Sequence, residues 1–208
     1  MIIAVDGPAA SGKGTIARAL AAHFRLPHLD TGLLYRAVGL NLLRSGGDPA
    51  SETDAVAACD FSDAMLGDEG LRSEAASAAA SMVSAYPAVR ACLLQRQRAF
   101  AGQPGGAVLD GRDIGTVIAP EADAKLFVKA TPAMRARRRH NELVRNGHNI
   151  SYDRVLADIR TRDRRDMLRS TAPLVQAIDA MLLDTSYLDI HTAIDRAIGL
   201  VESRVSAR

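Results

Sequence analysis

The fold of this 208-residue chain is decided near its start, where residues 2–15 read IIAVDGPAASGKGT. The apolar run at residues 2–5 is typical of a buried strand, and the apolar residues that recur from Ile16 to Phe24 predict a helix. A glycine-rich segment between a strand and a helix is the context in which a loop binds phosphate. The sequence therefore predicts a phosphate-binding loop (P-loop) at residues 7–15.

The residue types of this loop suit a nucleoside triphosphate. Glycines let backbone N–H groups turn toward phosphate oxygens, and the N-terminus of the following helix adds the positive end of its dipole. Lys13 supplies a mobile positive charge for the β- and γ-phosphates. We expect ATP to be bound by the loop residues Gly7, Pro8, Ala9, Ala10, Ser11, Gly12, Lys13, Gly14 and Thr15.

The loop departs from the usual pattern in one place, and the departure concerns Mg²⁺. The Ser or Thr that commonly follows the lysine is Gly14 here, with Thr15 one position later. We therefore expect the ion to be held by phosphates, waters and an outer-sphere carboxylate rather than by a hydroxyl. Asp110 and Asp30, each at the end of a predicted strand, are the candidates, although such an aspartate also commonly caps a turn.

Apolar runs alternate with helical patterns along the chain, which indicates an α/β fold with a mainly parallel sheet. We expect strands near residues 2–6, 27–30, 107–110, 124–129 and 180–184. We expect helices at residues 13–24, 31–45, 74–85, 87–101, 132–146, 151–168 and 187–204. We predict a single domain with a core formed by residues 1–45, 102–131 and 170–208, a mostly helical insertion at 46–101 and a lid at 132–169.

Composition excludes several classes of protein. Hydrophobic residues make up 48% and charged residues 24% of the chain, which is ordinary for a globular domain and excludes disordered, collagen-like and disulfide-scaffold classes. No run of about 18 apolar residues is present, so no membrane span is expected. Cys59 and Cys92 have no metal-binding or redox spacing, and no signal peptide is recognisable. We therefore expect two buried, reduced thiols in a cytoplasmic protein.

Positive charge is concentrated in one part of the chain. Residues 130–170 contain 11 arginines and 5 acidic residues, although the net charge of the whole chain is only +2. Two triplets are spaced so that each shares one helix face: Arg135, Arg138 and Arg139, and then Arg162, Asp166 and Arg169. This pattern predicts a lid that closes over phosphates. The alternative is a solvated surface with ion pairs such as Asp158–Arg162.

A P-loop alone leaves several activities open. A GTPase is not favoured because the base-reading Asn-Lys-x-Asp motif is absent. The arginines favour transfer from ATP to a second phosphorylated substrate, because guanidinium groups offset the repulsion between two polyanions. The acceptor phosphate is already anionic and needs no general base, and the sequence shows no obvious Ser/His/Asp or Cys/His constellation.

Three alternatives stay open: a P-loop kinase for another small acceptor such as UMP, AMP or a non-nucleotide, a nucleic-acid-binding P-loop module, and an NTP-binding protein without transfer activity. Nucleic-acid binding is disfavoured because the basic excess is confined to one segment and only four Phe and four Tyr are available for stacking. The five histidines show no ligand spacing and are assigned no role.

The chain resembles the bacterial cytidylate kinases, of the nucleoside monophosphate kinase group, over about residues 2–200. Besides the P-loop, the resemblance is carried by DTGLLYR at 30–36, by residues 81–90, by DGRDIGT at 110–116, and by RDRRD at 162–166 with the residues that follow to 174. It implies a five-stranded parallel sheet with helices on both sides, an acceptor-binding insertion and a lid. Bacterial members commonly have a longer insertion, so the short segment 60–72 predicts a trimmed acceptor region.

The resemblance also implies ATP-dependent phosphorylation of CMP and dCMP with Mg²⁺. We expect a monomer, because the sequence shows no heptad pattern and no obvious apolar patch, and we expect no nucleic-acid or membrane partner. The resemblance implies that CMP is bound by Thr31, Tyr35, Arg36, Ser81, Arg90, Arg112, Asp113, Arg162, Asp166 and Arg169. It implies catalytic roles for Lys13, Arg112, Arg162 and Arg169, and ATP contacts by Arg135, Arg138 and Arg139. Within the acceptor set, the cytosine is assigned to Ser81, Arg90 and Asp113.

The chemistry of Asp113 agrees with that assignment. A carboxylate only accepts hydrogen bonds, and the cytosine amino group donates them. Uracil presents an acceptor at the same place, so a site built on this carboxylate is expected to discriminate against it.

Overall fold

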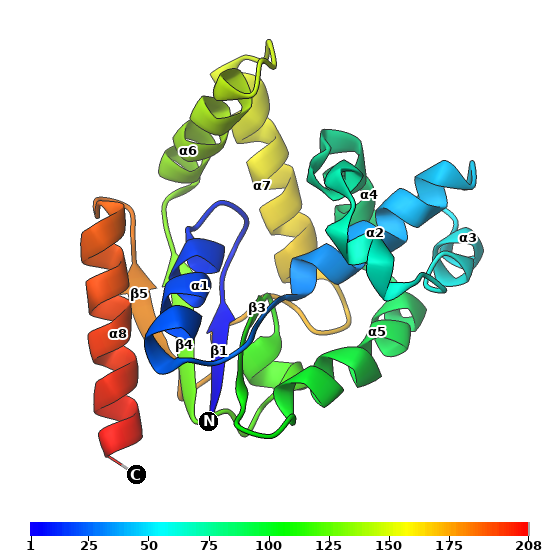
Figure 1. Ribbon diagram of the computed structural model, residues 1–208. Coiled ribbons are helices and arrows are strands. Elements are labelled where there is room, and N and C mark those ends of the chain that lie inside the picture. Colours follow the sequence, from blue (N-terminus) through cyan, green and yellow to red (C-terminus); the bar gives the residue numbers. More distant parts are fainter. Residues whose placement is uncertain (208) are drawn as a thin grey trace. The chain divides into compact units, whose positions relative to one another are not determined.

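The computed structural model describes residues 1–207 and shows an α/β fold built on a five-stranded sheet (Figure 1). The strands are β1 (Ile2–Asp6), β2 (His28–Asp30), β3 (Ala107–Gly111), β4 (Ala124–Lys129) and β5 (Met181–Asp184). Their order in the sheet is β2-β3-β1-β4-β5, and the pairs β1–β3, β1–β4 and β4–β5 are parallel. The predicted five-stranded sheet is confirmed, and β1 lies at its centre.

The helices begin and end within a few residues of the predicted bounds. They are α1 (Lys13–Phe24), α2 (Thr31–Arg44), α3 (Glu52–Ala57), α4 (Glu74–Val83), α5 (Pro87–Ala101), α6 (Pro132–Arg145), α7 (Tyr152–Leu168) and α8 (Ile190–Ser206). Three shorter helical segments are η1 (Asp63–Gly67), η2 (Glu69–Arg72) and η3 (Ile114–Ile118). Short polar side chains cap several first turns, as Thr131 does for α6, Ser151 for α7 and Asp189 for α8.

One prediction about α7 is wrong. The helix ends at Leu168, and Arg169 adopts an extended conformation (φ −62°, ψ 143°). Arg169 therefore does not share a helix face with Arg162 and Asp166. It begins instead a turn that returns to the helix, where the backbone N–H of Leu174 donates a hydrogen bond to the carbonyl oxygen of Asp166 (2.8 Å).

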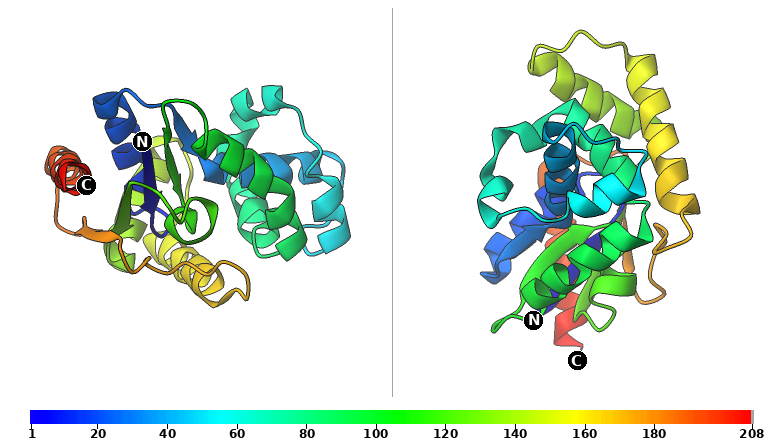
Figure 2. Two further views of the ribbon diagram at one scale, coloured as in Figure 1. Left: turned by 90° about the horizontal axis from the view of Figure 1, so that it is seen from below. Right: turned by 90° about the vertical axis from the view of Figure 1, so that its right-hand side faces the viewer.

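The described chain forms two compact units, and the first comprises residues 1–29 and the chain from Ala101 onward. Its sheet is covered by α1 and α8 on one face, and Figure 2 (left) shows η3 on the opposite side of the sheet from α1. Ile3 and Val5 of β1 are fully buried in this core. Strands covered on both faces are apolar along their length, which explains why β1 lacks alternation.

The helices α6 and α7 form the predicted lid segment of this unit and pack against each other (Figure 1). Their contact is apolar and includes Ala136, Leu143, Val155 and Ile159. Ala10 of the P-loop also packs against this cluster.

The second unit, Asp30–Phe100, is helical. It contains most of the expected insertion, 46–101, and also α2, which packs against α4. The segment 60–72 forms no strand, as predicted, and is organised by η1 and η2. Leu71 is buried there beside Ala37 and Leu40 of α2. A small apolar cluster thus stabilises the short segment.

The prediction of two buried thiols is wrong. Cys59 is half-buried, and Cys92, on α5, is exposed. Both are free thiols in the described chain, and burial raises the pKa of Cys59 to about 12, with Cys92 adding to the effect. Among residues 1–207, no helix is both long and apolar enough to cross a membrane.

We expect Gly7→Ala to lower the free energy of unfolding by about 3 kcal/mol, because a Cβ there would overlap the carbonyl oxygen of Val128 on β4. Urea unfolding followed by circular dichroism measures the change. Gly105→Ala is the matched control. Gly105 also has a positive φ (+87°), but a Cβ there would have no neighbour within 4 Å, so we expect a loss of about 1 kcal/mol. Equal losses would contradict the steric explanation.

Candidate functional site

The P-loop leaves the carboxyl end of β1 and enters α1 at Lys13. Gly12 precedes the helix in a left-handed conformation (φ 92°), which aims the first N–H groups of α1 out of the helix end. The carbonyl oxygen of Ser11 accepts hydrogen bonds from Thr185 Oγ1 (2.8 Å) and Arg138 Nη1 (3.3 Å). The loop is therefore fixed by the segment after β5 and by α6.

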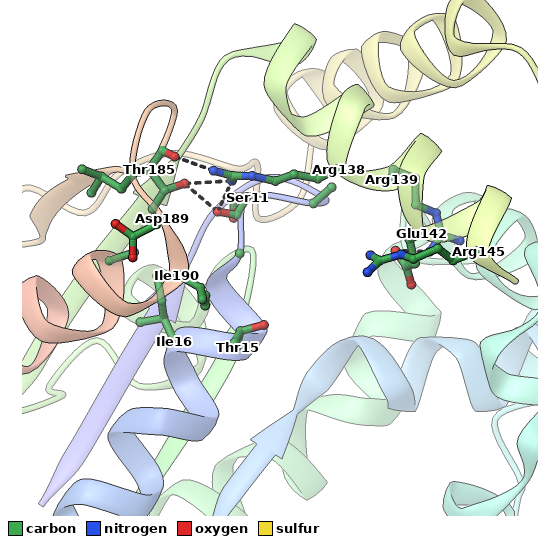
Figure 3. A pocket seen from close by; sticks show the side chains of 14 residues that line it. Ser11, Thr15, Ile16, Arg138, Arg139, Glu142, Arg145, Thr185, Asp189 and Ile190 are labelled. Atoms are coloured by element: carbon green, nitrogen blue, oxygen red, sulfur yellow. Dashed lines mark hydrogen bonds and ion pairs between the residues drawn. The ribbon is translucent and has the colours of Figure 1, made fainter.

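A cavity of about 440 Å³ adjoins the loop (Figure 3). One wall comes from α6, with Arg138, Arg139, Glu142 and Arg145. The other comes from the segment that joins β5 to α8, with Thr185, Leu188, Asp189 and Ile190. A cavity of this size holds a small ligand, and the arginines together with the N-terminus of α1 favour an anionic one.

The three α6 arginines that were predicted to bind ATP are placed differently. Arg138 and Arg139 line the cavity, whereas Arg135 does not. The side chain of Arg135 is buried and forms a two-bond ion pair with Asp163 of α7 (2.9 and 2.5 Å). It also donates to the carbonyl oxygen of Ala9 (3.1 Å). In this structure Arg135 thus connects α6, to which it belongs, with the P-loop and with α7.

Five of the predicted acceptor residues lie together in the first unit. Arg112 Nε is 2.8 Å from Asp166 Oδ2, and Arg169 Nη2 is 3.7 Å from Asp113 Oδ1. Arg162 acts on the same carboxylate as Arg112, since both influence the pKa of Asp166. The cluster joins the end of β3, the helix α7 and the turn after it.

The charges of this cluster sum to a net positive value, which favours binding of an anion. Burial raises the pKa of Asp166, but the positive charges of Arg112, Arg162 and Arg169 outweigh burial and hold this pKa below its ordinary value. Asp166 is therefore ionised at neutral pH. Three guanidinium groups against two carboxylates leave a net positive charge, which suits a phosphate.

The other five predicted acceptor residues lie in the second unit. Thr31, Tyr35, Ser81 and Arg90 are buried, and the guanidinium carbon of Arg90 lies 5.6 Å from the centre of the Tyr35 ring. Arg36 Nη1 is 3.5 Å from the carbonyl oxygen of Leu71. Within this unit the structure brings Tyr35 and Arg90 together as a cation–π pair.

The two aspartates that were candidates for Mg²⁺ have different surroundings. Asp30 accepts a hydrogen bond from the backbone N–H of Gly32 (2.9 Å) and caps α2. The Asp110 carboxylate lies beside the P-loop, 3.7 Å from the position that a Cβ would take at Gly14. Asp110 Oδ1 is also 2.8 Å from His28 Nε2. The histidine thus fixes the direction of a carboxylate that faces the loop.

Asp6 at the end of β1 was missed by sequence analysis. Its carboxylate accepts hydrogen bonds from the backbone N–H groups of Ile114 and Gly115 at 2.8 Å each. Burial raises the pKa of Asp6 to about 6, and the nearby charge of Asp113 adds to this, while the two hydrogen bonds and Lys13 act in the opposite direction. An aspartate that ends an apolar strand directly before Gly7 is the signal that could have found it.

The cavity residues after β5 and the partner of Asp110 were also missed. Thr185 follows the last strand at its carboxyl end, the edge of a parallel sheet where ligands bind, so its position carried a usable signal. The role of His28 left no signal in the sequence, because its partner Asp110 is 82 positions away.

Comparison with known proteins gives concordant matches. A family model described as cytidylate kinase matches residues 3–203. The cytidylate kinase of Xanthobacter autotrophicus is 59% identical over 210 residues and covers 100% of both chains. The cytidylate kinase of Methylocella silvestris is 56% identical and covers 98% of this chain and 94% of its own.

Solved structures share the fold at lower sequence identity. A gluconokinase from Sinorhizobium meliloti 1021 has a TM-score of 0.53 at 14% identity, covering 99% of this chain and 94% of the other. An uncharacterized protein from Eubacterium ventriosum has a TM-score of 0.56 at 16% identity, covering 98% of this chain and 99% of the other. At such identities the likeness concerns the fold alone.

We expect Asp6→Asn to change how stability depends on pH. The folded pKa of Asp6, about 6, lies above its ordinary value of 3.8, so the folded state binds more protons between these pH values. The contribution of Asp6 to stability therefore falls as pH rises from about 4 to 6. The variant lacks this loss, so its free energy of unfolding relative to wild type should rise by roughly 2–3 kcal/mol across the window.

Urea unfolding at pH 4, 5, 6 and 7 measures the difference. The groups that face Asp6, namely Lys13, Asp113 and Lys125 beside Gly115, are the same in both proteins. Asp123→Asn is the control, because Asp123 Oδ2 accepts a hydrogen bond from Ile2 N (2.8 Å) at the other end of β1. Parallel curves for wild type and Asp6→Asn would contradict the prediction.

Proposed function

Because the chain belongs to the cytidylate kinase family, we propose that it transfers the γ-phosphoryl group of ATP to CMP and dCMP, releasing ADP with CDP or dCDP. The observation that carries this proposal is the cluster of Arg112, Arg162 and Arg169 around Asp113 and Asp166, in the same unit as the P-loop. Two polyanions repel each other, and guanidinium groups offset that repulsion with bidentate hydrogen bonds.

ATP is assigned to the P-loop and the adjoining cavity. Residues 7–15 and the N-terminus of α1 bind its phosphates, with Lys13 at the β- and γ-phosphates. We assign the adenosine to the cavity of about 440 Å³, and we assign Arg138 and Arg139, which line it, to the phosphates. Arg145 on the same wall is a further candidate contact. The ion pair of Arg135 with Asp163 supports a bracing role for Arg135.

The acceptor attacks through an oxygen of its own phosphate. A bond forms between this oxygen and the γ-phosphorus, and the bond from the γ-phosphorus to the β–γ bridging oxygen breaks in line with it. The attacking oxygen is already anionic, so no residue has to remove a proton. Lys13, Arg112, Arg162 and Arg169 stabilise the charge on the transferring group.

Cytosine is recognised through Asp113, whose carboxylate accepts a hydrogen bond from the base amino group. Arg169 Nη2 lies 3.7 Å from Oδ1 of this carboxylate, so its positive charge is placed to orient the Asp113 side chain. Asp166, the second carboxylate of the cluster, accepts from ribose hydroxyls. The remaining acceptor contacts are assigned, from the family resemblance, to Thr31, Tyr35, Arg36, Ser81 and Arg90 of the second unit.

The residues present fit a nucleotide-bound Mg²⁺. No group of three or more His, Cys, Asp or Glu side chains among residues 1–207 is placed to hold a metal ion by itself. Phosphate oxygens and waters would thus supply most ligands, with Asp110 as an outer-sphere carboxylate beside Gly14. When bound, the ion neutralises charge on the β- and γ-phosphates. Asp30 is the weaker candidate because its carboxylate caps α2.

The organisation of the chain supports separate segments for covering the donor and for binding the acceptor. We assign residues 132–169 to a lid over the donor and residues 46–101, shortened at 60–72, to acceptor binding. Rotation of such a segment over a bound nucleotide excludes water and so prevents hydrolysis of ATP. A monomeric state, a cytoplasmic location and the absence of nucleic-acid partners stay predictions.

The first experiment measures ADP release from Mg-ATP with CMP, dCMP, UMP, AMP, GMP or no acceptor. We expect CMP and dCMP to stimulate release most, because Asp113 accepts from the cytosine amino group. Asp113→Ala should raise the KM for CMP and reduce discrimination against UMP by about 10-fold or more. Steady-state kinetics with each nucleotide measure both effects.

A carboxylate outside the site provides the control. Glu202→Ala removes a hydrogen bond with His23 (2.9 Å) between α8 and α1 and should leave the acceptor preference unchanged. Release chiefly with UMP or AMP would overturn the acceptor assignment, and release with no acceptor preference would overturn the proposed activity.

We expect His28→Leu to raise the Mg²⁺ concentration needed for half-maximal rate by about 10-fold, because it frees the carboxylate of Asp110 to turn away from the loop. His28→Gln keeps a donor and should retain more of the wild-type response. His23→Leu is the control, since it removes a histidine–carboxylate pair with Glu202 on the exposed side of α1. An identical Mg²⁺ dependence in wild type and His28→Leu would exclude this role.

A further inference from the structure

Asp6 is the last residue of β1, directly before the P-loop, and the proposed mechanism gives it no part. Its side chain is 5% exposed, and both of its carboxylate oxygens accept a hydrogen bond. Oδ1 accepts from the backbone N–H of Ile114 and Oδ2 from that of Gly115, each at 2.8 Å. One carboxylate therefore binds the first two amides of η3.

These amides directly follow Asp113, the proposed reader of the cytosine amino group. Asp113 has φ −147° and ψ 26°, which belongs to neither helix nor strand, so no regular hydrogen-bond ladder orients it. Its carbonyl oxygen accepts hydrogen bonds from the backbone N–H groups of Val117 (2.9 Å) and Ile118 (3.2 Å). Asp6 adds a further attachment of the backbone, since it binds the amides of the two residues after Asp113.

The approach of Asp6 to this backbone depends on the glycine at 115. A Cβ at Gly115 would lie 3.4 Å from Asp6 Oδ2 and 3.1 Å from Cδ of Lys125, and the second distance is tighter than ordinary contact. A larger residue would therefore require Lys125 or η3 to shift by a few tenths of an ångström. Because residue 115 is glycine, its backbone fits between Asp6 of β1 and Lys125 of β4, and its N–H donates to the Asp6 carboxylate.

Burying the ionised carboxylate of Asp6 costs free energy, because the charge is removed from water, and an uncharged residue would avoid this cost. Burial raises the pKa of Asp6, and the charge of Asp113 raises it further, while Lys13 lowers it. Asparagine would carry no charge to bury, but it has one acceptor oxygen where two N–H groups require acceptors. An aspartate at this position therefore accepts from both amides, Ile114 and Gly115, which an asparagine oxygen could not do equally well.

We propose that Asp6 is a positioning residue for acceptor specificity, which holds Asp113 in the direction that meets cytosine by binding the amides of Ile114 and Gly115. This inference rests on the proposed function of Asp113. The alternative is a role through Lys13, whose positive charge lowers the pKa of Asp6. A role through Lys13 would alter the KM for ATP, whereas a role through Asp113 alters the KM for CMP.

Steady-state kinetics of the full chain with CMP, UMP and ATP test the proposal. We expect Asp6→Asn to raise the KM for CMP about 10-fold and to lower the preference for CMP over UMP by a similar factor. The KM for ATP should change by less than about 2-fold. Asp123→Asn, which removes a carboxylate from Ile2 N (2.8 Å) at the other end of β1, should keep wild-type values for all three nucleotides.

A second variant distinguishes the proposed positioning role of Asp6 from a purely structural role. Asp6→Glu keeps the charge but displaces it by one methylene group. We expect Asp6→Glu to lose CMP preference too, and it replaces Asp6→Asn if that variant does not fold. Equal loss of activity toward CMP and UMP in either variant, or a rise confined to the KM for ATP, would overturn the proposal.

Asp113→Ala separates failure of this inference from failure of the proposed function. If Asp113→Ala loses the preference for CMP, adding Asp6→Asn should reduce it no further, because both changes act on one carboxylate. If Asp113→Ala loses the preference while Asp6→Asn keeps it, the inference fails and the role of Asp113 stands. If Asp113→Ala keeps the preference, the role of Asp113 fails, and the inference fails with it.

Discussion

Parallel pairing of β1 with β3 on one side and β4 on the other is the constraint on which the site depends. The carboxyl ends of parallel strands meet at one edge, so the P-loop after β1 and the segment Asp110–Asp113 at the end of β3 share that edge. β4 contributes the close contact of Val128 with Gly7, which fixes where the loop leaves the sheet. Thr185, just after β5, completes the loop's support through Ser11.

The same edge gathers several buried carboxylates. Asp6, Asp113 and Asp166 are all buried there, and burial by itself disfavours their charged forms. Arginines keep Asp166 ionised, whereas Asp6 relies mainly on backbone amides. Burial of these carboxylates lowers the free energy of unfolding. In return, charges and backbone dipoles at this edge can act on a phosphate with little solvent reorganisation.

Features with local spacing could be predicted from the sequence. The P-loop, the strand ending at Asp110 and the arginine-rich helices each show their pattern within about twenty residues, and the family resemblance supplied the roles. The five-stranded sheet followed from alternation of strand and helix patterns. Arg169 was misplaced because helical spacing was continued past Leu168, where the chain turns back to the carbonyl oxygen of Asp166.

Contacts across long sequence distances could not be predicted. The pairing of His28 with Asp110 and the bond of Arg135 to Ala9 join segments 82 and 126 positions apart. The exposure of Cys92 depends on which side of α5 faces its unit, and that helix has weak apolar periodicity. Tertiary packing decides such positions, and one sequence contains no local trace of it.

The central position of β1 has a consequence for biosynthesis. Its partners on both sides, β3 and β4, end at Gly111 and Lys129, so an apolar first strand emerges long before anything can pair with it. At ribosomal rates of roughly 5–20 residues per second, this delay lasts on the order of ten seconds. The second unit, Asp30–Phe100, is contiguous and can fold in that interval. The central strand therefore waits unpaired until residue 129 has been made, and the sheet can assemble only after that point.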